Sequence, residues 1–69
     1  MNLQELCYSY SVLLDAIEHE TSQAAFLDLE SERVKLHNLV MDALDAAGIQ
    51  YADRWHSTEI ALHIARGEQ

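Results

Sequence analysis

No proline occurs in this chain, and Gly48 is its first glycine. The long segment before Gly48 therefore lacks both of the residues that most strongly disfavour the interior of an α-helix. Residues 1–32 of that segment contain seven acidic side chains and neither Lys nor Arg. About half of the chain is thus helix-permissive and uniformly negative, which predicts an all-α fold with an acidic outer surface.

The chain has 69 residues, a length typical of one domain, and we expect residues 1–69 to form a single helical domain. A domain this short buries only about 60% of its unfolded surface, so disulfides, metals or partner subunits commonly add stability. Cys7 is the only cysteine, which excludes an internal disulfide and is typical of a reducing compartment. The N-terminal residues have no basic segment and no long apolar run, so we expect no signal peptide, no membrane span and a cytoplasmic location.

The charge balance limits the kinds of partner. Four Lys or Arg residues stand against twelve Asp or Glu residues, a formal net charge of -8. Such a surface repels phosphate backbones and anionic membranes, so we expect no direct binding to nucleic acid or to a membrane. We expect the partner to be a larger protein with a basic or neutral surface. With 49% apolar residues, the chain is also far too hydrophobic for a disordered acidic tail.

The first predicted helix begins after Asn2, which forms a capping-box pattern with Glu5. Its apolar residues recur at spacings of three and four, as in an amphipathic helix: Leu3, Leu6, Tyr10, Leu13 and Ile17. Residues 21–23, Thr-Ser-Gln, favour a turn in which Thr or Ser caps the next helix. The alternative is one continuous helix over residues 3–47.

The second predicted helix runs to about Ala47, and Gly48 suits the left-handed position that follows a helix end. This helix is apolar on two sides. Its main stripe comprises Phe26, Leu29, Leu36, Val40, Ala43 and Ala47. Its second stripe comprises Leu27, Val34 and Met41. Because the first helix covers only one stripe, we expect a second copy of the chain to cover the other in a homodimer.

A shorter third helix is predicted to begin at Asp53 or Ser57 and to end before Gly67. One face of it carries three potential metal ligands: His56, Glu59 and His63. Imidazole and carboxylate groups bind divalent cations, but the two histidines lie two turns apart, and a solvated polar edge is the favoured interpretation. We therefore expect no metal and no cofactor.

No catalytic constellation is recognisable in the sequence. Cys7 lies beside the apolar stripe of the first helix, where a lone cysteine is usually a small buried hydrophobe. No cation precedes residue 33 to lower the pKa of that thiol. Ser9 and Ser11 lack the sequence context of an activated nucleophile. We expect that the protein is not an enzyme.

The candidate contacts with a partner are apolar and acidic. Tyr8 and Val12 lie on the back of the first helix, away from its apolar stripe, and an exposed Tyr is typical of interface anchors. Trp55 is interpreted equally well as a second anchor or as the closure of a small core. The acidic candidates are Asp15, Glu18, Glu30 and Glu32.

The acidic residues also permit a different function. A nucleic-acid mimic presents spaced carboxylates to the basic groove of a nucleic-acid-binding protein, and Asp28 adds to the four acids just named. The simpler interpretation is that an acidic outer face keeps an apolar helix bundle soluble.

An early tyrosine (Tyr8 or Tyr10), a long middle helix and then Arg54 with Thr58 follow one another along the chain. This order of parts resembles small phage-encoded helical proteins that sequester immune nucleotides or block host factors. The resemblance covers a handful of residues and assigns no family. A nucleotide pocket of that kind would need more positive charge than one chain readily offers, unless subunits pool it.

We therefore expect a helical hairpin with a shorter third helix, assembled as a small helical-bundle oligomer. The function inferred is protein–protein interaction, as an inhibitor or modulator of a larger cytoplasmic protein, with a phage or plasmid origin in keeping with its size. The first alternative is the nucleic-acid mimic. The second is a small-ligand or metal-binding oligomer that uses His56, Glu59, His63 and Arg54.

Overall fold

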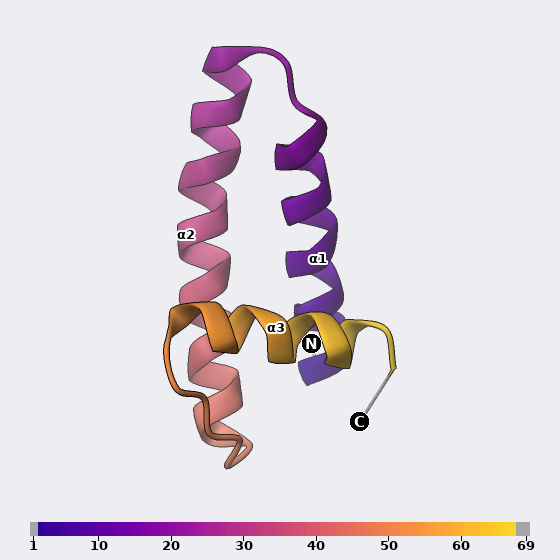
Figure 1. Ribbon diagram of the computed structural model, residues 1–69, viewed down its shortest axis with the longest axis vertical. Coiled ribbons are helices and arrows are strands. Elements are labelled where there is room, and N and C mark those ends of the chain that lie inside the picture. The colour runs from indigo at the N-terminus through magenta and orange to yellow at the C-terminus, as the bar shows by residue number, and fades with distance from the viewer. Residues whose placement is uncertain (1, 68–69) are drawn as a thin grey trace.

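The computed structural model describes residues 2–67, which form three helices and no strand. Helix α1 spans Leu3–His19, α2 spans Gln23–Ala46 and α3 spans Arg54–Ala65. Helices α1 and α2 run antiparallel as a hairpin, and α3 lies across the half of the hairpin nearer the N-terminus of α1 (Figure 1). The expected all-α hairpin with a shorter third helix is confirmed.

Each helix begins at a polar side chain that satisfies a free backbone N–H. Asn2 Oδ1 accepts a hydrogen bond from the Glu5 N–H at 2.8 Å, and Asn2 Nδ2 donates to the Glu5 carboxylate at 3.3 Å. Ser22 and Asp53 cap α2 and α3, and each accepts from the N–H three residues further on. The break lies at residues 20–22, so the predicted turn at residues 21–23, with Ser22 as the cap, is confirmed to within one residue, and the alternative of one continuous helix is wrong.

Helix α2 ends in a Schellman motif built on Gly48. The Ile49 N–H donates to the Leu44 carbonyl at 2.9 Å, and the Gly48 N–H donates to the Asp45 carbonyl at 3.1 Å. Gly48 has φ 76°, a left-handed conformation that glycine adopts without the strain of a Cβ atom. The reversal brings Ile49 against the core and directs the chain toward α3.

The core lies where α3 crosses the hairpin. Its buried apolar residues are Cys7, Tyr10, Val40, Leu44 and Ala61. Half-buried residues surround them, among them Leu3, Leu6, Leu14, Leu36, Ile60 and Ile64. Cys7 is fully buried, as its position beside the apolar stripe predicts, and this burial raises the pKa of its thiol.

The buried face of α2 differs from the main apolar stripe read from the sequence. Of that stripe only Val40 is fully buried, whereas the other members are half-buried or exposed. The buried positions are His37, Val40 and Leu44, which recur at spacings of three and four. This face turned inward because α3 packs on the hairpin from one side, which the apolar pattern of α2 alone does not reveal.

The second apolar stripe of α2 remains largely uncovered by this chain. Leu27 is 60% exposed, Val34 is also exposed, and Met41 is half-buried. Beyond α3 the hairpin consists of two helices only, formed by the C-terminal half of α1 and the N-terminal half of α2 (Figure 1). Within residues 2–67, none of the helices combines the length and the apolar character needed to traverse a bilayer.

Candidate functional site

A cluster of buried polar side chains joins the three helices. Tyr10 comes from α1, His37 from α2, and Ser57 with Thr58 from the first turns of α3. The rings of Tyr10 and His37 stack with centroids 5.1 Å apart and an interplanar angle of 27°. Polar groups in a core must find partners within it, and every buried side-chain polar atom in the described part of the chain has a hydrogen bond.

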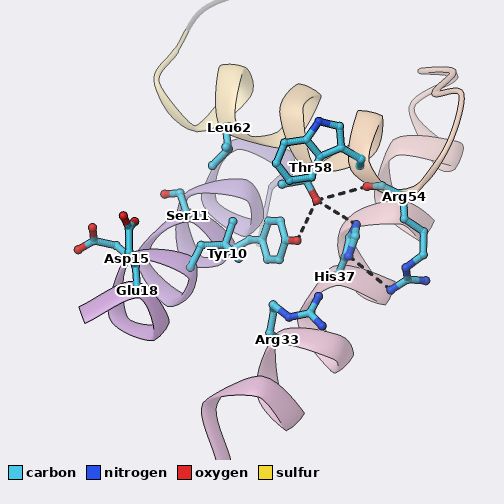
Figure 2. Close-up of a pocket in the computed structure, with 11 residues that line it drawn as sticks. Tyr10, Ser11, Asp15, Glu18, Arg33, His37, Arg54, Thr58 and Leu62 are labelled. Atoms are coloured by element: carbon cyan, nitrogen blue, oxygen red, sulfur yellow. Dashed lines mark hydrogen bonds between the residues drawn. The ribbon is translucent and has the colours of Figure 1, made fainter. Parts of the chain in front are cut away.

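The hydrogen bonds of this cluster form one network that ends on a single carbonyl, and within it His37 Nε2 also lies 3.4 Å from Thr58 Oγ1 (Figure 2). Ser57 Oγ donates to the Arg54 carbonyl at 2.7 Å, and Thr58 Oγ1 donates to the same carbonyl at 3.3 Å. Both hydroxyl protons are thereby used. Ser57 Oγ therefore accepts from His37 Nε2 at 2.8 Å, and Thr58 Oγ1 accepts from the Tyr10 hydroxyl at 3.0 Å.

This arrangement fixes the neutral form of His37. Its Nε2 carries the proton given to Ser57, which leaves Nδ1 as an acceptor for Arg54 Nη2 at 3.4 Å. The pKa of His37 is lowered, first by burial and then by the positive charges of Arg54 and Arg33. A neutral imidazole therefore lies between two guanidinium groups.

Beside this cluster the three helices line an open groove of about 550 Å³, which we call the charged groove. Helix α1 contributes Asp15 and Glu18 on one side, and α2 and α3 contribute Arg33 and Arg54 on the other. Figure 2 shows the two carboxylates at one end, the two guanidinium groups at the other, and Tyr10 between them. The apolar part of the lining is formed by Leu14, Trp55 and Leu62.

Arg33 is partly neutralised within its own helix. Its Nε donates to Glu30 Oε2 at 2.9 Å, and this hydrogen bond is the main reason that the pKa of Arg33 is raised. The Arg33 guanidinium points toward Tyr10 and His37 in Figure 2. Arg33 is therefore permanently charged and held in place at the edge of the charged groove.

The proximity of His37 and Ser57 does not create an accessible nucleophile. Ser57 is completely buried, and its proton is committed to the Arg54 carbonyl. Activated serines must present Oγ to a substrate beside their base. The pair therefore joins α2 to α3, and the groove offers charge, hydrogen bonds and an aromatic surface for binding.

The candidate partner contacts read from the sequence are spread over several surfaces. Asp15, Glu18 and Trp55 line the charged groove, and Trp55 is 71% exposed, so it does not close the core. Tyr8 and Val12 are exposed on α1 and do not line that groove. The two remaining acids each pair one turn along α2: Glu30 with Arg33, and Glu32 with Lys35 at 3.7 Å.

The face of α3 that carries His56, Glu59 and His63 is polar and largely exposed. His56 Nδ1 accepts a hydrogen bond from the Ala52 N–H at 2.8 Å, which ties it to the loop before α3. Among residues 2–67, no three His, Cys, Asp or Glu side chains gather as metal ligands would.

Sequence reasoning missed the residues at the centre of the site. His37, Ser57 and Arg33 were assigned no role, and Thr58 entered only through the resemblance. One signal was present: His37 lies three residues before Val40 and seven before Leu44, on the stripe that becomes buried. A histidine on that stripe is buried only if another helix covers it, which depends on where α3 packs.

Comparisons with known proteins give no external guide to this site. No protein-family model matches the chain, no curated protein is significantly similar to it, and no solved structure matches its fold significantly.

Proposed function

We propose that this protein is a small acidic interaction module that inhibits or modulates a larger cytoplasmic protein with a basic or neutral surface. The observation that carries the proposal is the exposure of large apolar side chains on an otherwise acidic surface. They are Tyr8, Val12, Phe26, Leu27, Val34, Leu39 and Trp55. Exposed Trp and Tyr side chains are characteristic of protein interfaces.

Trp55 is the strongest single anchor for such a partner. With 71% of the residue exposed, its indole presents a broad apolar surface in the groove that Asp15 and Glu18 also line. Burial of a tryptophan in a partner supplies much of the binding free energy at typical hot spots. The net negative charge of the chain speeds the encounter with a basic partner through long-range attraction.

We also propose that two copies of the chain associate as a homodimer. Leu27 and Val34 are exposed and Met41 is half-buried, so this stripe offers an apolar strip along one side of α2. Pairing of two such strips buries both at once, which is how a two-fold dimer interface works.

A nucleic-acid mimic fits the same surface less well. Glu30 and Glu32 each pair with a cation on α2, so two of the spaced carboxylates are partly neutralised. A mimic relies on free carboxylates and its complex weakens steeply with salt, whereas an apolar anchor is insensitive to salt.

Affinity capture from cells that produce the protein tests the interaction. The protein immobilised on resin should retain one stoichiometric protein partner at both low and high salt. Trp55→Ala, once circular dichroism confirms its helix content, should lose that partner, and Lys35→Gln should keep it. Equal retention by the Trp55 variant, or loss of the partner at high salt alone, would contradict an apolar-anchored interface.

A further inference from the structure

We propose that the charged groove binds a zwitterionic small molecule with a planar ring. Arg33 and Arg54 hold its anionic group, which is a carboxylate or a phosphate. Trp55 contacts the ring, and the carboxylates of α1 accept an ammonium group at the opposite end. The groove shares Trp55 with the surface proposed above for a protein partner, but isolated protein suffices to test small-molecule binding without that partner.

The positions of the two arginines carry the anion-binding half of this inference. The chain has four Lys or Arg residues, and two of them converge on His37 from different helices. Glu30 occupies Arg33 Nε, whereas Arg54 makes no ion pair with any residue in the 2–67 range. An anion that contacts both guanidinium groups would reduce the repulsion between these two like charges. A carboxylate or phosphate matches the planar fork of donors that a guanidinium presents.

The lowered pKa of His37 supports the same geometry. Both guanidinium groups contribute to the lowering, so both positive charges act at the imidazole. His37 Nδ1 accepts from Arg54 Nη2 and so orients the guanidinium of an otherwise exposed side chain. Orientation before binding reduces the entropy lost when a ligand is held.

The opposite wall of the groove carries the ammonium-binding half. Asp15 and Glu18 lie about one turn apart on α1 and line the end of the groove opposite Arg33 and Arg54 (Figure 2), where Asp15 Oδ1 also lies 3.5 Å from Nδ1 of the exposed His19. A ligand with both charges would match each wall with its complement. With a carboxylate as its anionic group, the ligand would also have no net charge, so the formal charge of -8 on the chain would not repel it from a distance.

The size and the aromatic rim of the groove indicate a small molecule. Its volume of about 550 Å³ is enough for a small molecule, and residues of all three helices line it. Trp55 and Leu62 form an apolar wall from α3, against which a planar ring can pack.

Trp55 is the only tryptophan in the chain, so its fluorescence reports directly on the groove. The probe is para-aminomethyl benzoate, a ring with a carboxylate at one end and an ammonium group at the other. We expect a saturable change in Trp55 fluorescence on titration at neutral pH. Benzoate should bind more weakly, because it lacks the ammonium group, and benzyl alcohol should not bind, because it lacks the anion.

Two variants separate the contributions of the two walls. Arg54→Gln should weaken the binding of the probe by about tenfold or more, as expected for the loss of a charge-assisted hydrogen bond. The control Lys35→Gln makes the same change of charge on the outer part of α2 and should bind the probe normally. Asp15→Asn combined with Glu18→Gln should abolish the preference for para-aminomethyl benzoate over benzoate.

Phenyl phosphate distinguishes the two sources of the anion. Tighter binding of phenyl phosphate than of benzoate shows that the groove prefers a phosphate ester, and the reverse order shows that it prefers a carboxylate. The proposal is overturned if none of the charged probes gives a saturable response. It is equally overturned if benzyl alcohol binds as well as the charged probes, or if Arg54→Gln and Lys35→Gln behave alike.

Discussion

His37 lies at the contact of all three helices, and its charge depends on its neighbours. Tyr10 stacks on it from α1, Arg33 lies one turn before it on α2, and Arg54 with Ser57 approach it from α3. Protonation would place a third positive charge between two guanidinium groups and would remove the acceptor used by Arg54. The fold is therefore built around a neutral histidine.

A dependence of stability on pH follows from this histidine. Its pKa in the folded protein lies below the usual value of 6.5, mainly through burial. Between that lowered pKa and pH 6.5 the unfolded chain binds more protons than the folded protein, so the free energy of unfolding falls as the pH falls. Urea unfolding at a series of pH values should show this loss, and His37→Gln should reduce it.

His19 provides the matched control for that experiment. Its pKa is raised, first by its hydrogen bond to the Asp15 carbonyl and then by the Asp15 charge, and its side chain is exposed. A raised pKa gives stability that is present at low pH and lost as the pH rises, the opposite sign to His37. His19→Gln should therefore leave the acid-side loss intact. Parallel profiles for the wild type and His37→Gln below pH 6.5 would show that His37 does not contribute this loss.

The small core predicts unequal costs for two truncations on the hairpin. Leu44 is fully buried under α3, so Leu44→Ala should lower the free energy of unfolding by about 2–5 kcal/mol. Tyr8 is exposed, and Tyr8→Ala should change it by less than about 0.5 kcal/mol. Urea denaturation followed by circular dichroism measures both. Comparable losses in the two variants would place Tyr8 in a buried contact.

At the residue scale, the apolar pattern predicted correctly whether some side chains are buried or exposed. It failed for side chains whose burial depends on another helix. Cys7 is buried and Tyr8 and Val12 are exposed, as the stripe on α1 predicts, because that stripe depends only on helical spacing. His37 and Ser57 are buried although polar, because their partners come from a different helix. A pattern of hydrophobicity along one helix contains no information about such partners.

At the scale of the elements, the boundaries of the helices were predictable because the signals are local. Asn2, Ser22 and Asp53 each act as a cap within three residues of the group they satisfy. Gly48 ends α2 by adopting a conformation that depends on its own backbone. The pairing of α1 with α2 follows from the short turn between them, since a short turn makes consecutive helices antiparallel neighbours.

Gly48 offers a test of what ends α2. An added Cβ at this position meets no atom within 4 Å, so Gly48→Ala introduces no clash and costs only the left-handed conformation. We expect Gly48→Ala to lower the free energy of unfolding by about 1 kcal/mol. Gly48→Asn should cost less, because asparagine tolerates this conformation. Thermal and urea unfolding measure both; an equal cost for the two variants would mean that the conformation is not the cause.

At the scale of the whole molecule, the place where α3 crosses the hairpin decides both the core and the groove. Because α3 covers only one half of the hairpin, the other half keeps two apolar helices without a third, and the charged groove opens at the boundary (Figures 1 and 2). The crossing depends on contacts between residues far apart in sequence, such as Tyr10 with Thr58. No local feature of the sequence indicates where α3 crosses the hairpin. The sequence therefore predicted the helices but not the groove.

The apolar side chains exposed on the uncovered half of the hairpin predict that the protein forms a dimer. Leu27 and Val34 are exposed on one side of α2, and a second copy of the chain would bury them. Sedimentation equilibrium at micromolar concentration should give twice the mass of one chain, and Leu27→Ser with Val34→Ser should shift it toward one chain. Leu39→Ser is the control, since Leu39 is equally exposed but lies on a different face of α2. If the wild type is a monomer, the prediction of a homodimer is wrong, and the apolar stripe is left for a different partner to cover. If only Leu39→Ser dissociates the dimer, the interface lies on the face of α2 that carries Leu39.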